Sequence, residues 1–485
     1  MPGGRNSAAR TTPDSSPDLV VAELGSALFS SFAREDQRRK GVEYLSGLLR
    51  AGGRKSIRNI AQAVGGQATE QYLHHFISDS TWCWGPVRRA LAEYVRRVAE
   101  PDAWVVRPML IPKAGKHSVG VDRRFCPELG QTLNAQQAMG VWAVSDDVTI
   151  PVDWRLHLSQ AWVRDPGRRS RAAIPDWARA ETEGECAVEA FLGMDARPDF
   201  PDRPLVLDAR GMDVHAAVAR LHPTTPLLMR ISGTQGFTVL DPAVARRGAE
   251  PLPARQIMGM ARETRKPVAG RWPLLAATVR VGVPGLGGRA GDAVRVGGGQ
   301  AGQSGLPGHG ERVETTGHTG QLDSPGYGTR IGVTGQAGQS GWLIRGARVG
   351  AADQVNGLTS RIGAVSRARV GELVLLGVGS AGQPWPGELW LSNQPDVDVA
   401  TLLRTSRFLD RVDHDFARFG DRVGLRDFTG RSFAGWHRHT TLASAAHAVL
   451  ALADSAHRGG RPSRTDEPVA ADYHYPLADE LPPAQ

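Results

Sequence analysis

The sequence contains few cysteines: only three occur among 485 residues, at positions 83, 126 and 186. They stand far apart and in no metal-ligand spacing, which favours reduced thiols in a reducing cytosol over a disulfide framework or a zinc site. The sequence also lacks any run of about 18 apolar residues, the length that a membrane-spanning helix needs. Residues 1–17 are rich in Gly, Ser and Pro and have no apolar core. This segment is therefore predicted to be disordered rather than a signal peptide, and the protein is expected in the cytoplasm without a membrane partner.

The charge balance of the chain is basic. Lys and Arg number 58 against 50 Asp and Glu, which gives a formal net charge of +8. An excess of positive charge favours polyanionic partners such as nucleic acid, because it attracts phosphate backbones. A chain of this length exceeds one usual domain, so two or three structural units are expected.

Residues 18–98 have the apolar spacing of helices. Ser56 is placed to cap a helix that begins at Ile57, and the pair Gly65-Gly66 is placed to end it before a second helix. Two short helices around a glycine turn are typical of a helix-turn-helix, in which Arg54, Lys55 and Arg58 would contact DNA phosphates. The alternative is a plain helical bundle with a solvated basic face.

Residues 99–248 mix short apolar strands with helices, which indicates an α/β sheet. The expected strands are 103–106, continued by 109–111, then 139–144, 148–154, 204–207 and 227–231. A helix is expected over 213–221.

The second half of the chain begins with an insertion, expected over 249–397. Within it, residues 281–346 are so rich in Gly that they are predicted to form a loop without a core of its own. Strands are expected at 373–376 and 388–393. Helices are expected over 398–424 and 441–452, within a C-terminal part of the core at 398–458, followed by a disordered tail over 459–485.

Two carboxylates stand out by their position. Asp208 directly follows an apolar strand, where an open α/β sheet presents side chains to a crevice. Asp413 lies one helical turn from Leu409 and from Phe416, at the edge of an apolar stripe. A half-buried carboxylate needs a metal, a proton or a charged partner. Each could equally be a capping or salt-bridged acid.

Several other side chains allow two interpretations. His437 and His439, like the pair His74-His75, could bind zinc, but no Cys or acid completes a ligand set and structural hydrogen bonds are favoured. The lysines at positions 113 and 116 are interpreted as phosphate contacts beside the site, with ordinary surface lysines as the alternative. The tryptophans at 390 and 436 are interpreted as core residues rather than as platforms for base stacking.

Five segments together resemble the DDE insertion-sequence transposases, in the branch of the DDE superfamily endonucleases. The resemblance spans residue 33 to about residue 280 and then 385–455. It rests on the segments 111–121 (IPKAGKHSVGV), 151–156 (PVDWRL), 205–209 (LVLDA), 389–393 (LWLSN) and 430–439 (GRSFAGWHRH).

The resemblance implies an RNase H-like core in which three acids hold two Mg²⁺ or Mn²⁺ ions for DNA phosphodiester cleavage and strand transfer. Asp208 matches the second acid, and Asp413 stands where the family has a Glu. The first acid, however, is replaced, because Arg107 and Pro108 occupy the place of an Asp-Asp pair. The guanidinium puts a permanent positive charge where a metal ion should bind. Substitution by another acid, such as the carboxylates at positions 102, 122 and 153, is not expected.

These observations lead to three hypotheses about function. The first is a working transposase, the second a transposase-derived DNA-binding protein with impaired or lost cleavage, and the third an interaction scaffold that no longer binds DNA. Arg107 and Pro108 favour the second over the first, and the basic N-terminal helices favour it over the third. The resemblance further implies double-stranded DNA, the terminal repeats of an insertion sequence, as the partner, with a homodimer on DNA and association with the nucleoid.

Overall fold

The computed structural model describes most of the chain between residues 17 and 459. The described ranges are 17–65, 67–126, 130–195, 203–242, 244, 250–269, 271, 273–284 and 372–459. They belong to one compact unit. The predictions for residues 1–16, for 285–346 of the Gly-rich segment and for the tail from residue 460 lie outside the described residues.

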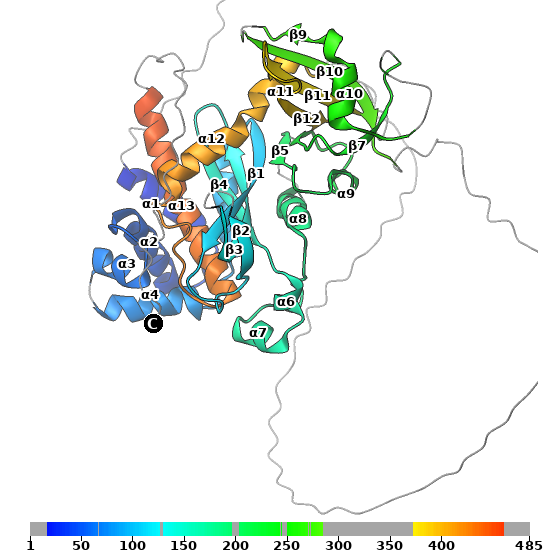
Figure 1. The fold of residues 1–485 in the computed structure, drawn as a ribbon. Coiled ribbons are helices and arrows are strands. Elements are labelled where there is room, and N and C mark those ends of the chain that lie inside the picture. Colours follow the sequence, from blue (N-terminus) through cyan, green and yellow to red (C-terminus); the bar gives the residue numbers. More distant parts are fainter. Residues whose placement is uncertain are drawn as a thin grey trace, which may run out of the picture. The chain divides into compact units, whose positions relative to one another are not determined.

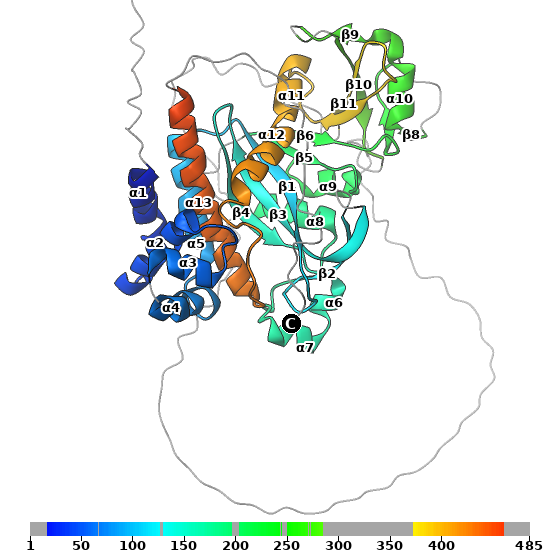
Figure 2. The same cartoon turned by 60° about the vertical axis from the view of Figure 1, so that its left-hand side comes forward.

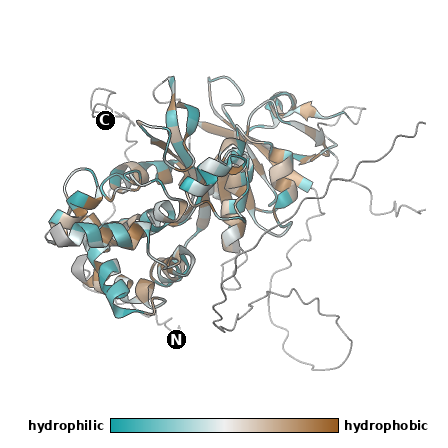
Figure 3. Ribbon diagram, turned by 90° about the horizontal axis from the view of Figure 1, so that it is seen from below, coloured by the Kyte–Doolittle hydropathy of each residue, from teal (hydrophilic) through white to brown (hydrophobic). Residues whose placement is uncertain are grey.

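The N-terminal region is helical, as expected (Figures 1 and 2). Ser56 caps the third helix as predicted, since its Oγ accepts a hydrogen bond from the Asn59 N–H at 3.2 Å. In Figure 3 these helices carry both hydrophilic and hydrophobic stretches, as helices that bury one side do. The helices are α1 (Pro17–Phe29), α2 (Glu35–Arg50), α3 (Ile57–Val64), α4 (Gln67–Ser78) and α5 (Trp84–Val98).

A mixed β-sheet follows. In its first half the strands run in the order β4-β3-β1-β5-β6, with β1, β3 and β4 antiparallel and β1, β5 and β6 parallel. This topology confirms the expected mixed α/β class. The strands are β1 (Ala103–Pro112), β2 (Asp122–Cys126), β3 (Gln131–Val144), β4 (Thr149–Leu156), β5 (Leu205–Asp208) and β6 (Leu227–Arg230).

Strand β1 is continuous and runs through Arg107 and Pro108, which joins the apolar run 103–106 to its expected continuation at 109–111. The Trp104 N–H donates to the Pro204 carbonyl at 2.9 Å, so the even-numbered residues of β1 direct their backbone nitrogens toward β5. The β1–β5 pairing ends at Val106. Pro108 therefore lies beyond the part of β1 that pairs with β5, and its missing N–H interrupts no hydrogen bond between these two strands.

The sheet continues beyond β6 through the strands of the insertion, in the order β12-β11-β10-β7-β8, with β9 paired to β10. Short helices cover parts of it. These elements are β7 (Gly236–Val239), β8 (Leu252–Pro253), β9 (Lys266–Pro267), β10 (Leu274–Gly282), β11 (Glu372–Ser380), β12 (Glu388–Ser392), α9 (Val214–Arg220), α10 (Ala254–Met260) and a 3-10 turn (Arg262–Thr264).

The helices that pack on the first half of the sheet lie on its two sides (Figures 1 and 2). On one side are α12 (Phe408–Asp415) and α13 (Phe433–Gly459), and on the other is α8 (Glu183–Asp195), which packs on β1, β3 and β4. Helix α13 is buried over most of its length between β4 and the N-terminal helices. The remaining short helices are α6 (Gln160–Val163), α7 (Pro166–Arg171) and α11 (Val399–Ser406).

Two of the predicted helices differ from those observed. The single helix expected over 398–424 is divided at Arg407 into α11 and α12 and then widens into a π-helical turn, Phe416–Gly420. The helix expected over 441–452 begins eight residues earlier, at Phe433. Its first turns carry polar side chains, such as His437 and His439, that are buried by tertiary contacts, and apolar spacing in the sequence cannot show this.

Candidate active site

The two carboxylates singled out from the sequence lie together, on opposite sides of one arginine. Asp208 is the last residue of β5, and Asp413 lies on α12, which packs across β1 and β5. Arg107 projects from β1 between them. Its Nε donates to Asp413 Oδ1 at 2.9 Å, its second terminal nitrogen bonds to Asp413 Oδ2, and Nη1 lies 3.8 Å from Asp208 Oδ2.

A second arginine, which the sequence analysis did not single out, completes this cluster. Arg210 follows Asp208 in the turn after β5. Its Nε lies 2.9 Å and 3.1 Å from the two carboxylate oxygens of Asp208, and its Nη2 lies 2.6 Å from Oδ2. A cationic residue two positions after a strand-end Asp was the available signal, since such short spacing brings the two side chains together in a turn.

The charges of the cluster are thus paired within the protein. Burial raises the pKa of Asp208, but the hydrogen bonds from Arg210 and the charges of Arg210 and Arg107 outweigh this effect, so its pKa lies below the ordinary value. The carboxylate is ionised near neutral pH. Asp208 and Asp413 are therefore both salt-bridged acids, one of the two alternatives to a metal-binding role considered from the sequence.

The other acids considered as substitutes are engaged elsewhere. Asp102 precedes β1 and accepts a hydrogen bond from the Asp146 N–H at 3.3 Å. Asp122 lies 3.9 Å from Arg124, and Asp153 lies 2.8 Å from Arg88. In the described part of the chain, no group of three or more His, Cys, Asp or Glu side chains is arranged to hold a metal ion.

The five residues predicted to contact DNA have different environments. Arg54, Arg58 and Lys116 are exposed. Lys55, by contrast, is only 4% exposed, and its ammonium donates to the Ala51 carbonyl while its backbone N–H donates to Asp427 at 2.7 Å. The interpretation of Lys55 as a phosphate contact is therefore corrected: the side chain is part of the packing around α3.

Lys113 requires the same correction. Its ammonium donates to the Phe428 carbonyl at 2.6 Å. Burial, together with the charge of Arg54, lowers the pKa of this ammonium to about 8. Lys113 therefore ties the end of β1 to the loop before α13 rather than offering a free cation at the surface.

The histidines considered as zinc ligands are not gathered into a common site. His439 Nδ1 lies 2.8 Å from the Tyr44 hydroxyl, and its Nε2 lies 2.7 Å from the Gly424 carbonyl. Since a carbonyl only accepts, Nε2 carries the proton and Nδ1 accepts from Tyr44. His74 and His75 are exposed on α4. Trp390 and Trp436 are both buried, in agreement with their interpretation as core residues.

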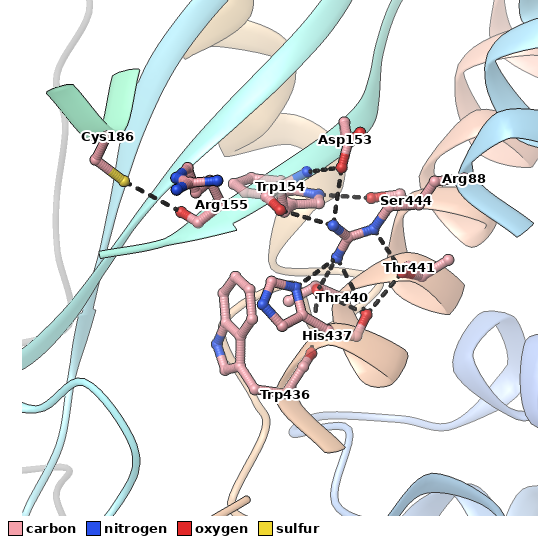
Figure 4. A network of polar contacts seen from close by, with 10 residues as sticks. All are labelled: Arg88, Asp153, Trp154, Arg155, Cys186, Trp436, His437, Thr440, Thr441 and Ser444. Atoms are coloured by element: carbon pink, nitrogen blue, oxygen red, sulfur yellow. Dashed lines mark hydrogen bonds and ion pairs between the residues drawn. The ribbon is translucent and has the colours of Figure 1, made fainter. Parts of the chain in front are cut away.

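Arg88, on α5, forms the centre of a second polar cluster (Figure 4). The guanidinium is 3% exposed and donates to Asp153 Oδ1 at 2.8 Å and to the Trp154 carbonyl at 2.6 Å, both on β4. It also contacts the backbone and side chains of α13 at residues 437, 440 and 441. This cluster joins the N-terminal helices to the sheet.

The strand order β4-β3-β1-β5-β6 with helices on both sides defines an RNase H-like core. Residues 27–266 match the DDE superfamily endonucleases, which supports a DDE-type, transposase-like protein. No curated protein matches the chain. Nucleases of this superfamily act on DNA and typically use divalent metal ions. None of the helices in the described part of the chain has both the length and the apolar composition needed to cross a membrane.

Proposed function

We propose that this protein is a transposase-derived DNA-binding protein of an insertion sequence in which metal-dependent DNA cleavage is impaired. The observation that carries the proposal is the position of Arg107. Register pairs Val106 of β1 with Leu207 of β5, so Arg107 lies beside Asp208, where the family resemblance implies the first acid. A guanidinium therefore stands where a carboxylate would hold the metal ions.

The residues present do not fit a divalent cation. Mg²⁺ and Mn²⁺ bind carboxylate oxygens, and the oxygens of Asp413 bond to Arg107 while those of Asp208 bond to Arg210. A cation entering the cluster would have to displace a guanidinium and would be repelled by the positive charge that remains. We therefore assign no cleavage step to these residues.

DNA binding is supported by the basic charge of the chain and by the exposed side chains Arg54, Arg58 and Lys116. Double-stranded DNA, and in particular the terminal repeats of the element, is the proposed partner. A homodimer that pairs two DNA ends, and an association with the nucleoid, would follow from this role.

The proposal is tested by incubating the protein with a supercoiled plasmid that carries the ends of the element, in the presence of Mg²⁺ or Mn²⁺. Wild-type protein should give no nicking above that of an Asp208→Asn variant. The triple variant Arg107→Asp/Arg210→Ala/Asp413→Glu, which restores the three acids that the resemblance implies and removes the second guanidinium from Asp208, should nick the plasmid, and EDTA should stop the reaction.

Efficient EDTA-sensitive nicking by wild-type protein, abolished in Asp208→Asn, would show that the centre is active and the proposal wrong. Salt-dependent binding of the same DNA is measured in parallel by fluorescence anisotropy. Absence of binding at low salt would contradict the DNA-binding part of the proposal independently of cleavage.

A further inference from the structure

A small pocket lies between the loop after β1 and the short helices α6 and α7. Its volume is about 110 Å³. Three of its lining side chains are cationic, one is an imidazole, and none is a carboxylate. The lining residues are Lys116, His117, Trp162, Arg168, Arg171 and Ala172.

One of the two arginines is held in place by its neighbours. The guanidinium carbon of Arg168 lies 5.3 Å from the centre of the Trp162 ring. Trp162 is buried, and its indole N–H donates to the Val121 carbonyl at 3.0 Å. Arg168 Nε also lies 3.6 Å from Asp165, the residue that caps α7. This support orders the guanidinium before any ligand arrives, which lowers the entropy cost of binding.

The charge around the pocket remains positive after this pairing. Lys116 and Arg171 are exposed, and Asp165 is one carboxylate beside Arg168 and Arg171. Arginine side chains bind phosphate oxygens through two parallel N–H groups, and lysine adds a point charge. The chemistry of the pocket therefore fits a phosphate group.

The pocket is also connected to α3, the helix predicted to contact DNA. The loop before α13 makes both connections. At one end the Phe433 N–H donates to the Ala172 carbonyl at 2.8 Å, directly beside the pocket. At the other end Asp427 accepts from the Lys55 N–H at 2.7 Å and lies 4.0 Å from Arg54. One loop thus contacts both the segment before α3 and the residue that follows α7.

We propose that this pocket binds a backbone phosphate of double-stranded DNA, in addition to the phosphates that α3 would bind. The proposal rests on the DNA binding proposed above and adds Arg168 and Arg171 to it. Since cationic side chains that bind phosphates release counterions, removing them should weaken binding of any sequence and reduce its salt dependence.

The test compares wild-type protein with Arg168→Gln/Arg171→Gln in anisotropy titrations of a random-sequence duplex at several salt concentrations. The variant should bind about tenfold more weakly at low salt. The slope of log affinity against log salt should fall by about 1 for each phosphate that the variant no longer binds. The charge-retaining variant Arg168→Lys/Arg171→Lys should keep most of the slope.

The matched control is Arg96→Gln/Arg97→Gln, which also removes two positive charges. These residues end α5, just before the start of β1, whereas the pocket lies beyond its other end, about 30 Å away at the rise of a strand. The control should keep the wild-type salt slope. If wild type binds DNA but the pocket variant has the same salt slope, the proposed phosphate pocket is wrong and the proposed function stands. If wild type does not bind DNA, the proposed function is wrong as well.

A free anion is distinguished from DNA by a second measurement. Thermal unfolding of both proteins is followed in inorganic phosphate and in chloride at equal ionic strength. Stabilisation of wild type by phosphate, combined with unchanged DNA binding of the pocket variant, would assign the pocket to a free phosphate and overturn the proposed binding of DNA there. A decrease in both DNA affinity and salt slope in the pocket variant supports it.

Discussion

Arg107 and Asp413 are 306 residues apart in the sequence and share a two-point ion pair, with Arg107 Nε 2.9 Å from Asp413 Oδ1. The arginine comes from a central strand and the aspartate from a helix that packs on it. The pair thus bonds α12 to the sheet at the place where the family resemblance implies metal ions. Together with Arg210, which bonds to Asp208, Arg107 supplies two guanidinium groups for the two carboxylates, a charge balance that needs no metal.

The first prediction concerns metal binding without reference to cleavage. Arg107→Asp/Arg210→Ala/Asp413→Glu should be stabilised by millimolar Mn²⁺, because a ligand that binds only the folded state at 100 times its Kd adds about 2.7 kcal/mol. This corresponds to a rise in Tm of several degrees, measured by differential scanning calorimetry. Wild type should show no such shift.

The control for this prediction is the same variant with Asp208→Asn, which removes a carboxylate that would hold the metal ion. It should lose the Mn²⁺-dependent rise. An equal rise in wild type would show that Arg107 does not block the metal and would contradict the interpretation of the centre.

From the sequence and the resemblance, Asp208, Asp413 and Arg107 could be expected at one place, but Arg210 and the individual bonds could not. Asp208 could be identified because an apolar strand precedes it directly, and Asp413 because of its place beside an apolar helical stripe. The bonds to Arg107 and Arg210 depend on the register of β1 with β5 and on the packing of α12, which no local pattern specifies.

Tertiary burial also explains the wrong predictions. Lys55 and Lys113 resemble surface lysines in the sequence. The Lys55 side chain is nevertheless buried, and its ammonium donates to the Ala51 carbonyl, whereas the Lys113 ammonium donates to the Phe428 carbonyl in the loop before α13. The start of α13 was missed for a related reason, since its polar residues are satisfied by partners from distant segments. Strands β5, β6 and β12 were predicted well, because short apolar runs of central strands are visible in the sequence alone.

The second prediction concerns the Arg88 cluster. Arg88→Ala should lower the free energy of unfolding by about 3–5 kcal/mol, because it leaves the partly buried carboxylate of Asp153 without this partner. Urea denaturation provides the measurement. Arg89→Ala, at the exposed neighbouring position on α5, should stay within about 0.5 kcal/mol of wild type. Equal effects of the two substitutions would show that the cluster does not stabilise the fold.

The third prediction concerns Gly424, in the turn that follows the π-helical segment. Its φ is +73°, and a Cβ added there would lie 2.4 Å from Lys55 Cγ. Gly424→Ala should therefore cost about 2–4 kcal/mol, from the left-handed backbone and from the clash with Lys55.

Gly53 provides the comparison for Gly424. Its φ is +57°, but a Cβ there would meet nothing within 4 Å. Gly53→Ala should cost only about 1–2 kcal/mol, the backbone penalty alone. If urea denaturation gave the two substitutions the same loss of stability, the predicted clash between an added Cβ at position 424 and the Lys55 side chain would be absent.

The last prediction concerns the pH dependence that Lys113 confers. Burial lowers the pKa of its ammonium from 10.5 to about 8 in the folded protein, so between these two pH values the unfolded chain binds one proton more than the folded chain. Stability contributed by this group is therefore lowest below pH 8 and rises as the pH increases toward 10.5.

In Lys113→Met this rise in stability with pH is absent. The difference in free energy of unfolding between wild type and Lys113→Met, measured in urea at pH 7 and at pH 10, should shift in favour of wild type by on the order of 1–3 kcal/mol. A difference that stays constant over this range would show that the ammonium keeps its ordinary pKa, and thus that the end of β1 is more open to solvent than its bond to the Phe428 carbonyl indicates.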